Sequence, residues 1–115
     1  MTGSDNLEIR EFLTLDGKNP FREWLRTLDV GPRARIQARV LRFSTGNLGD
    51  NKHVGASVWE ARVMTGPGYR IYFGKDGQRI LLLLIGGDKS SQSRDVSRAQ
   101  AYWREYLEVA RGKTK

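Results

Sequence analysis

The spacing of apolar residues changes along this chain, and each change predicts a different element. Apolar and polar residues alternate from Leu7 to Leu15, which predicts a strand. Asn19-Pro20 then begins a helix, because Asn is a good helix cap and Pro suits the first helical position. Apolar residues three and four positions apart give this helix one stripe to bury: Phe21, Trp24, Leu25 and Leu28.

A second helix is predicted from Gly31-Pro32 to about Thr45, where the run GNLGDN ends it. Its buried stripe consists of Ile36, Val40 and Phe43. Two short helices joined by so tight a turn form a helical hairpin, which needs a surface to pack against.

From Ser57 onward the period changes to two, which predicts strands. In SVWEARVM, Trp59 and Val63 share one face, and Glu60 and Arg62 share the other. The turns TGPG and GKDGQ separate this strand from YRIYF and from RILLLLI, so the three form an antiparallel meander. Because RILLLLI is apolar on both faces, we expect it to be covered on both sides.

A last helix is predicted from about Ser91 to Ala110, with an apolar side formed by Val96, Ala99, Trp103, Tyr106 and Ala110. The elements therefore follow the order β-α-α-β-β-β-α. This order predicts a single α+β domain with a core from about residue 7 to 110. Since Trp103 and Tyr106 are expected in the core, Tyr102 is the aromatic residue expected to remain exposed and to contact a partner protein.

Composition narrows the chemistry. The 115 residues contain no Cys and a single His, His53, which excludes a disulfide framework and argues against a Cys- or His-based metal centre. We therefore expect neither a metal nor a cofactor. The apolar run from Ile80 to Ile85 is too short to cross a bilayer, and the polar N-terminal stretch lacks the apolar region of a secretory signal. We expect a cytoplasmic protein that does not insert into membranes.

The charge indicates a partner. Twenty Lys and Arg residues, fourteen of them Arg, face thirteen Asp and Glu residues, which gives a net charge of +7. Arg favours bidentate recognition of phosphate and carboxylate groups, so we expect nucleic acid or an acidic protein as the partner. A basic, solvated surface without a partner is the alternative.

The second helix concentrates this charge, because no acidic residue occurs between Pro32 and Thr45. Such a helix is expected to lie along an RNA backbone or to receive an acidic protein, since unrelieved like charge costs stability. His53 is the side chain with an ordinary pKa near neutrality, and it is either a general acid or base or an incidental loop residue. The residues predicted to contact RNA are Arg35, Arg39, Arg42, Lys52 and His53.

The buried strand ends abruptly in Gly86-Gly87-Asp88-Lys89. Two glycines allow a sharp turn and the close approach of a phosphate or another chain. Lys89 then precedes the last helix, which we expect Ser90 or Ser91 to cap, and a cation beside a helix N-terminus favours anion binding. A simple strand-to-helix turn with solvated charges is the alternative.

Two arginines add to this interpretation. Arg62 and Arg70 are predicted on the exposed face of one hairpin, where both can reach one phosphate. Glu60 shares that face and either holds an arginine in place, accepts a proton, or forms only a cross-strand ion pair with Arg62. We favour the purely structural role for Glu60.

Four segments have a familiar order: NPFREWLRTLD, GNLGDNKHVGASVWEARV, GPGYRIYF and LLLLIGGDKSSQSRDVSRAQAYW. Together they resemble the RelE/ParE superfamily of toxin–antitoxin toxins, and most closely its HigB-like branch of addiction-module killer proteins. The resemblance spans about residues 8 to 108, and GYRIYF followed by GGDKSSQ is its most specific part. It implies two helices packed on a twisted antiparallel sheet, followed by a C-terminal helix.

The resemblance also implies a function. Members typically bind the ribosomal A site and cut messenger RNA without a metal, and each is neutralised by a cognate antitoxin, in this branch usually a helix-turn-helix DNA-binding protein. By position, Arg70 and Lys89 match the basic residues that stabilise the phosphate in catalysis, and Arg62 is expected to position the scissile phosphate. Some members have a C-terminal Tyr or His that SQSRDVSRAQ lacks, with only Asp95 nearby. The alternatives are a non-enzymatic DNA gyrase inhibitor, as on the ParE side, and an inactive partner-binding relative.

Overall fold

The computed structural model describes residues 6–112, in which one strand is followed by two helices, four strands and a C-terminal helix. The helices are α1 (Pro20–Arg26), α2 (Val30–Phe43) and α3 (Gln92–Ala110), with a short 3-10 helix, η1 (Lys89–Ser91), directly before α3. The strands are β1 (Glu8–Glu11), β2 (Asn51–His53), β3 (Val58–Val63), β4 (Tyr69–Asp76) and β5 (Ile80–Gly87).

The strands form one sheet in the order β1-β5-β4-β3-β2. The meander β3-β4-β5 is antiparallel, as predicted, and the α+β class is confirmed. Two features refine the prediction. β1 runs parallel to β5, so the sheet is mixed, and the short polar segment from Asn51 to His53 adds a strand beside β3.

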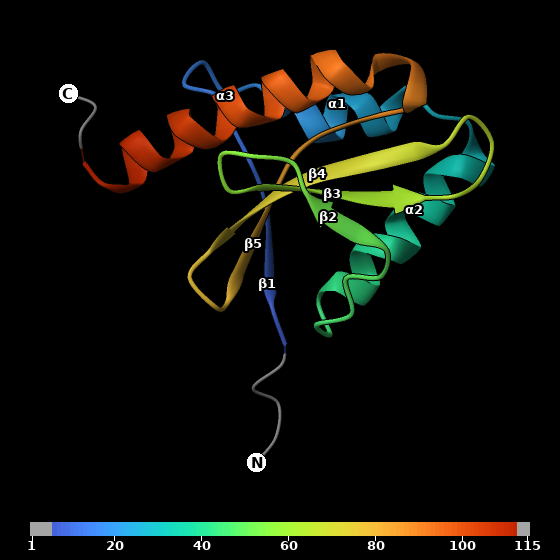
Figure 1. Cartoon of the computed structure of the whole chain (residues 1–115), viewed down its shortest axis with the longest axis horizontal. Coiled ribbons are helices and arrows are strands. Elements are labelled where there is room, and N and C mark those ends of the chain that lie inside the picture. The colour runs from blue at the N-terminus through green and yellow to red at the C-terminus, as the bar shows by residue number, and fades with distance from the viewer. Residues whose placement is uncertain (1–5, 113–115) are drawn as a thin grey trace.

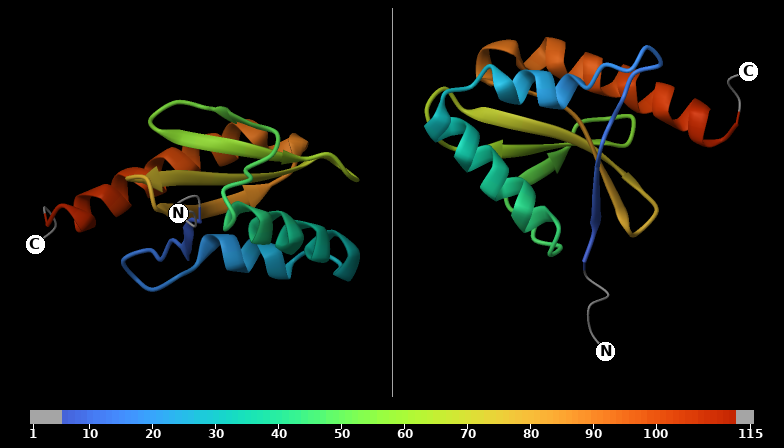
Figure 2. Two further views of the ribbon diagram at one scale, coloured as in Figure 1. Left: turned by 90° about the horizontal axis from the view of Figure 1, so that it is seen from below. Right: turned by 180° about the vertical axis from the view of Figure 1, so that it is seen from behind.

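Helices cover both faces of the sheet, with α1 and α2 on one face and α3 on the other (Figures 1 and 2). From Leu81 to Leu84, consecutive residues of β5 point into two different cores, which confirms that this strand is covered on both sides. The core under α1 and α2 contains Phe21, Leu25, Ile36, Phe43, Ala61, Val63, Ile71, Phe73, Leu81 and Leu83. The core under α3 contains Phe12, Val58, Tyr72, Leu82, Leu84, Ile85, Ala99 and Trp103.

The first strand is shorter than the predicted range of Leu7 to Leu15. The backbone N–H of Thr14 donates to the carbonyl of Lys18 at 2.8 Å, which closes a turn directly after the strand. Leu13 and Leu15 therefore leave the sheet, and they are 58% and 71% exposed. At the other end of the chain, Ala110 is exposed and does not extend the buried stripe of α3.

The helix caps follow the sequence in one place and differ in another. Asn19 caps α1 as predicted, because its side chain accepts a hydrogen bond from the Arg22 N–H at 2.9 Å. At the exit of β5, however, the capping side chain is Asp88, whose carboxylate accepts from the N–H of Ser90 at 2.9 Å and from its hydroxyl at 2.6 Å. Ser91 is the N-cap residue of α3, as predicted, but it makes no side-chain hydrogen bond to that helix, because η1 precedes it.

The edge of β5 is open along its last residues. β1 pairs with β5 only from Ile80 to Leu83, and the N–H of Phe12 adds one bond to the Leu83 carbonyl at 2.9 Å. Within the described sheet, β5 continues to Gly87 without a strand on this side. The open edge lies between α1 and α3 and becomes the floor of a cleft.

Gly74→Ala is expected to lower the free energy of unfolding by about 1–3 kcal/mol, because overpacking a core displaces its neighbours. A Cβ atom at Gly74 would lie 2.3 Å from the Trp103 ring. Urea denaturation measures the effect. The matched control is Gly31→Ala in α2, where no atom lies within 4 Å of the added Cβ. It should leave stability unchanged or raise it by up to about 1 kcal/mol. Wild-type stability of Gly74→Ala would contradict this packing.

Candidate functional site

The turn from Thr65 to Gly68, between β3 and β4, gathers basic residues from three other elements. Arg35 of α2 donates from Nη1 to the Thr65 hydroxyl at 2.5 Å. Arg70 of β4 donates from Nη1 to the Gly68 carbonyl at 2.8 Å. The backbone N–H of Lys89 in η1 donates to the carbonyl of Pro67 at 3.4 Å. Residues far apart in sequence therefore meet at one end of the sheet.

The main catalytic candidates flank a single glycine. A Cβ atom at Gly68 would lie 3.5 Å from Nη1 of Arg70 and 3.8 Å from Cβ of Lys89. Arg62 is the register partner of Arg70 on β3, and its Nε lies 3.3 Å from Oδ2 of Asp50. The structure thus places all three predicted catalytic residues at this end of the hairpin. We call the set Arg35, Arg62, Arg70 and Lys89 the basic cluster.

The predicted exposure of Glu60 and Arg70 is wrong. Arg70 is 8% exposed and Glu60 is completely buried, because η1 and α3 cover this face of the hairpin. Oε2 of Glu60 lies 3.6 Å from Nε of Arg70 and accepts hydrogen bonds from the Tyr72 hydroxyl at 3.0 Å and from Gln92 Nε2 at 2.9 Å. Glu60 therefore holds Arg70 in place, and the ion pair with Arg62 that we favoured does not form, because Arg62 pairs with Asp50.

This buried network fixes its members in one arrangement. Burial and the adjacent Glu60 carboxylate raise the pKa of Tyr72, so its hydroxyl remains a neutral donor. Within residues 6–112, Oε1 of Glu60 and Nε of Arg70 are buried without a hydrogen-bond partner. The carboxylate and the guanidinium depend on each other, since either charge left alone at this depth is costly.

Arg39 is also buried, and each nitrogen of its guanidinium donates to a backbone carbonyl, so the prediction that it contacts RNA is wrong. Its guanidinium donates to the carbonyls of Leu48 at 3.1 Å, Asp50 at 2.9 Å and Arg62 at 2.8 Å. Burial, with a smaller contribution from the charge of Arg42, lowers the pKa of Arg39. This side chain fastens the loop after α2 to β3 and is not available at the surface.

We expect Arg39→Gln to lower the free energy of unfolding by about 2–4 kcal/mol, because it removes charged hydrogen bonds to three backbone carbonyls. The matched control is Arg42→Gln on the exposed side of the same helix, which should change stability by less than about 0.5 kcal/mol. Chemical denaturation of the two variants provides the comparison. Equal losses would contradict the assigned role of Arg39.

The remaining RNA candidates lie apart from the basic cluster. Arg42 is exposed on α2 two turns beyond Arg35, about 10 Å further along the helix axis. Lys52 and His53 are exposed on β2, and the expectation that His53 lies in a loop is wrong because it pairs with Trp59. Their register places them toward the end of β3 farther from the basic cluster. Contact of these three residues with RNA stays a prediction.

Tyr102 is partly buried, whereas we expected it to be exposed. Its ring centroid lies 5.2 Å from that of Phe12, and its hydroxyl accepts a bond from Arg98 Nη2 at 3.4 Å. The physical reason is that Phe12, just after β1, packs under α3. Trp103 and Tyr106 pack against the sheet as predicted; burial and a 2.5 Å hydrogen bond donated to Asp76 raise the pKa of Tyr106 to about 12.

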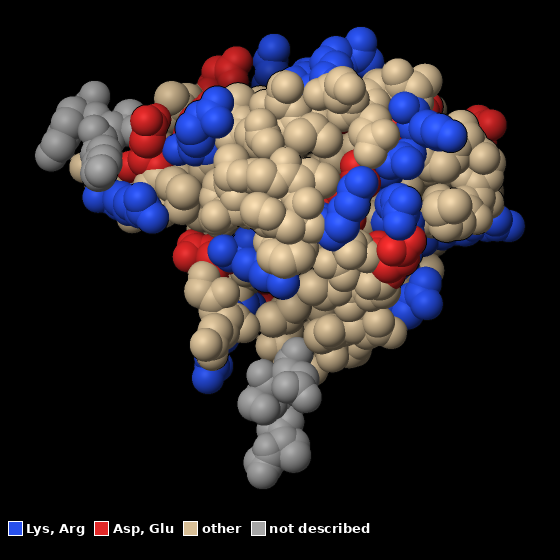
Figure 3. Space-filling view, in the orientation of Figure 1, with Lys and Arg blue, Asp and Glu red and all other residues tan. Residues whose placement is uncertain are grey.

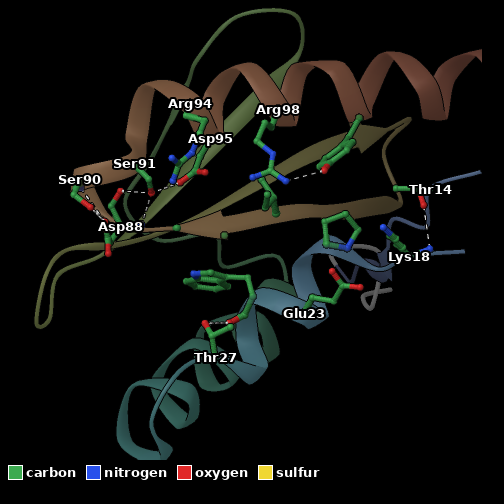
Figure 4. A pocket seen from close by; sticks show the side chains of 16 residues that line it. Thr14, Lys18, Glu23, Thr27, Asp88, Ser90, Ser91, Arg94, Asp95 and Arg98 are labelled. Atoms are coloured by element: carbon green, nitrogen blue, oxygen red, sulfur yellow. Dashed lines mark hydrogen bonds between the residues drawn. The ribbon is translucent and has the colours of Figure 1, made fainter. Parts of the chain in front are cut away.

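A cleft of about 570 Å³ lies between α1 and α3, and the sequence did not indicate it (Figure 4). Its floor is the open edge of β5 from Ile85 to Gly87. Trp24 lines it from α1, and Arg94 and Arg98 line it from α3. Gly86-Gly87 and the arginines at 94 and 98 are features of the sequence that could have pointed to this cleft. The sequence does not show, however, that α1 lies opposite α3. We call this feature the α1–α3 cleft.

The described residues add two further findings. Across residues 6–112, no group of three or more His, Cys, Asp or Glu side chains could hold a metal ion. No helix in the same range is long and apolar enough to cross a membrane. On the face shown in Figure 3, basic side chains occupy several separate patches among fewer acidic ones.

The fold and the site define a small α+β domain with helices on both sheet faces and a basic cluster at the turn of a hairpin. No protein-family model matches the sequence. The chain is 37% identical to an uncharacterized protein of Haemophilus influenzae over 95 residues, which cover 82% of this chain and 90% of the relative. It therefore belongs to the same family as that protein.

Proposed function

We propose that this protein is a toxin of the RelE/ParE type that cuts messenger RNA on the ribosome. The observation that carries the proposal is the basic cluster, in which Arg35, Arg70 and Lys89 reach one turn from three different elements. The order of elements agrees with the fold that the resemblance implies. A net charge of +7 favours association with a polyanion such as the ribosome.

The proposed reaction is transesterification of RNA. The 2′-oxygen of one nucleotide forms a bond to the adjacent phosphorus, and the bond from phosphorus to the 5′-oxygen breaks. A proton leaves the 2′-hydroxyl and another is added to the leaving oxygen, which yields a 2′,3′-cyclic phosphate and a 5′-hydroxyl end. Arg70 and Lys89 stabilise the charge that develops on the phosphate oxygens, while Arg62 positions the phosphate.

Arg70 is buried but can take this role, because its Nη2, unlike the nitrogens of Arg39, has no hydrogen-bond partner among the described residues. The Glu60 carboxylate lies 3.6 Å from Nε of Arg70, so the orientation of the Arg70 guanidinium is set before the RNA binds. A preorganised cation needs little reorganisation when charge develops on the phosphate. Neutralisation by a cognate antitoxin, expected to be a helix-turn-helix DNA-binding protein, and action in the cytoplasm belong to the same proposal.

Induction of the protein in growing cells, followed by mapping of 5′-hydroxyl ends, tests the proposal. We expect growth arrest together with new 5′ ends inside translated regions of messenger RNA. Growth arrest with stabilised gyrase–DNA breaks and no new RNA ends would instead support the gyrase inhibitor. Co-expression with a cognate antitoxin should restore growth and yield a complex that co-purifies.

A further inference from the structure

Three cationic side chains of the α1–α3 cleft have no acidic partner. Within residues 6–112, no side-chain hydrogen bond or ion pair engages the ammonium of Lys18 or the guanidinium of Arg94, and Arg98 donates only to the neutral hydroxyl of Tyr102. Arg94 and Arg98 are four residues apart and thus share one face of α3, and both line the cleft (Figure 4). The α3 wall of the cleft therefore carries two guanidinium groups that can bind an anion.

Most of the acidic groups in the cleft are occupied. The Asp88 carboxylate caps η1, and the bond from the Ser90 hydroxyl lowers the pKa of Asp88. Asp95 is 3% exposed and accepts a bond from the Ser91 hydroxyl at 2.5 Å. Glu23, on the α1 wall, is the lining carboxylate without a partner among the described residues. The two walls thus differ, with cations on α3 and a carboxylate on α1.

Aromatic rings accompany these charges. The Trp24 indole lies so close to the backbone of β5 that a Cβ atom at Gly86 would fall 2.1 Å from it. Tyr102 lines the opposite wall. Arginines interleaved with aromatic rings are typical of sites for single-stranded nucleic acid, where bases stack on rings and cations follow the phosphates. An acidic peptide would use the arginines but would leave Trp24 without a stacking partner.

The cleft adjoins the basic cluster. Gly87 in its floor is the register partner of Arg70 on β4, so their Cα atoms are about 5 Å apart. The η1 segment lies between the two sites and contributes residues to both. Lys89 belongs to the basic cluster, and Ser90 and Ser91 line the cleft. A chain that passes over η1 would contact both sites.

We propose that the α1–α3 cleft binds the RNA nucleotide next to the scissile phosphate. Arg94 and Arg98 bind its phosphate, and Trp24 contacts its base. The proposal rests on the proposed function and extends it, because it assigns RNA contacts to α1 and α3 in addition to the basic cluster.

Titration with a single-stranded hexanucleotide whose 2′-hydroxyls are methylated tests the location, since this RNA binds but cannot be cleaved. The indole N–H signals of Trp24, Trp59 and Trp103 report three different places and can be assigned with single Trp→Phe variants. We expect the Trp24 signal to shift and that of Trp103, which is 4% exposed in the core, to stay. A shift confined to Trp59 would place the RNA at Lys52 and His53 and overturn the proposal.

A matched pair of double variants separates local contact from overall charge. Arg94→Gln with Arg98→Gln should weaken RNA binding by at least about tenfold. It should also reduce the slope of log K against log salt by about 0.7, since each phosphate that is neutralised on a single strand contributes about that much. Arg79→Gln with Arg104→Gln removes the same charge from exposed positions outside the cleft and should bind nearly as the wild type does. Equal losses would refute the cleft as the site.

Two further outcomes are informative. Hexaglutamate that binds more tightly than the RNA, and depends on Arg94 and Arg98, would make the cleft a peptide site and overturn the proposal. If the cleft variants bind RNA normally while Lys89→Ala is inactive on ribosomes, the cleft proposal fails and the proposed function stands. If the wild type cuts no messenger RNA yet shows the Trp24 shift, the RNA site stands and the proposed function fails.

Discussion

Lys89→Ala should slow the cleavage of ribosome-bound messenger RNA by about 100-fold or more, because it removes a cation that stabilises the transferring phosphate. The side chain is exposed and makes no side-chain hydrogen bond among the described residues, so stability should change by less than about 0.5 kcal/mol. Single-turnover cleavage on ribosomes measures the rate, and urea denaturation checks the fold.

Lys75→Ala is a matched control, because Lys75 is an exposed lysine near the other end of β4. It should cut at nearly the wild-type rate. His53→Ala should likewise retain most activity, since β2 places His53 away from the basic cluster. Inactivity of His53→Ala combined with normal cleavage by Lys89→Ala would show that the catalytic site is wrongly assigned.

Arg70→Ala should lower the free energy of unfolding by about 3–5 kcal/mol, because it leaves Glu60 buried with an uncompensated charge. The exposed hairpin face predicted from the sequence would instead imply a loss below about 1 kcal/mol. Urea denaturation distinguishes these values. Wild-type stability of Arg70→Ala would contradict the buried pair.

The double variant Glu60→Gln with Arg70→Gln separates stability from catalysis. Removing both charges avoids an isolated buried ion, so most of the stability lost in Arg70→Ala should return. Cleavage should remain about 100-fold or more below the wild type, since the cation beside the phosphate is absent. Normal cleavage by a folded double variant would remove Arg70 from the mechanism.

Local patterns were sufficient to predict most of the fold. The period of two in β3 and β4 and the doubly apolar β5 correspond to the observed strands, and Asn19-Pro20 marks the start of α1. β2 escaped prediction because Asn51 to His53 is short and polar and is held by pairing with β3. The parallel partnership of β1 and β5 joins distant segments, which no local pattern specifies.

The sequence predicted which residues form the candidate site, but it did not predict which of them are buried. Strand parity correctly placed Glu60 and Arg62 on one face, but it could not show that η1 and α3 cover that face. The sequence analysis grouped Arg39 with Arg35 and Arg42 as RNA contacts, yet the loop after α2 folds back and brings its carbonyls to the Arg39 guanidinium. The α1–α3 cleft depends entirely on which helices meet across the edge of β5.

The most direct measurement of the central proposal uses purified protein, ribosomes stalled on a defined messenger RNA, and primer extension to map the ends. We predict cleavage within the codon in the A site, with a 5′-hydroxyl on the downstream fragment, and no cleavage of the same RNA without ribosomes. Messenger RNA that stays intact on ribosomes at saturating protein, with stabilised gyrase–DNA breaks in a parallel reaction, would contradict the proposal.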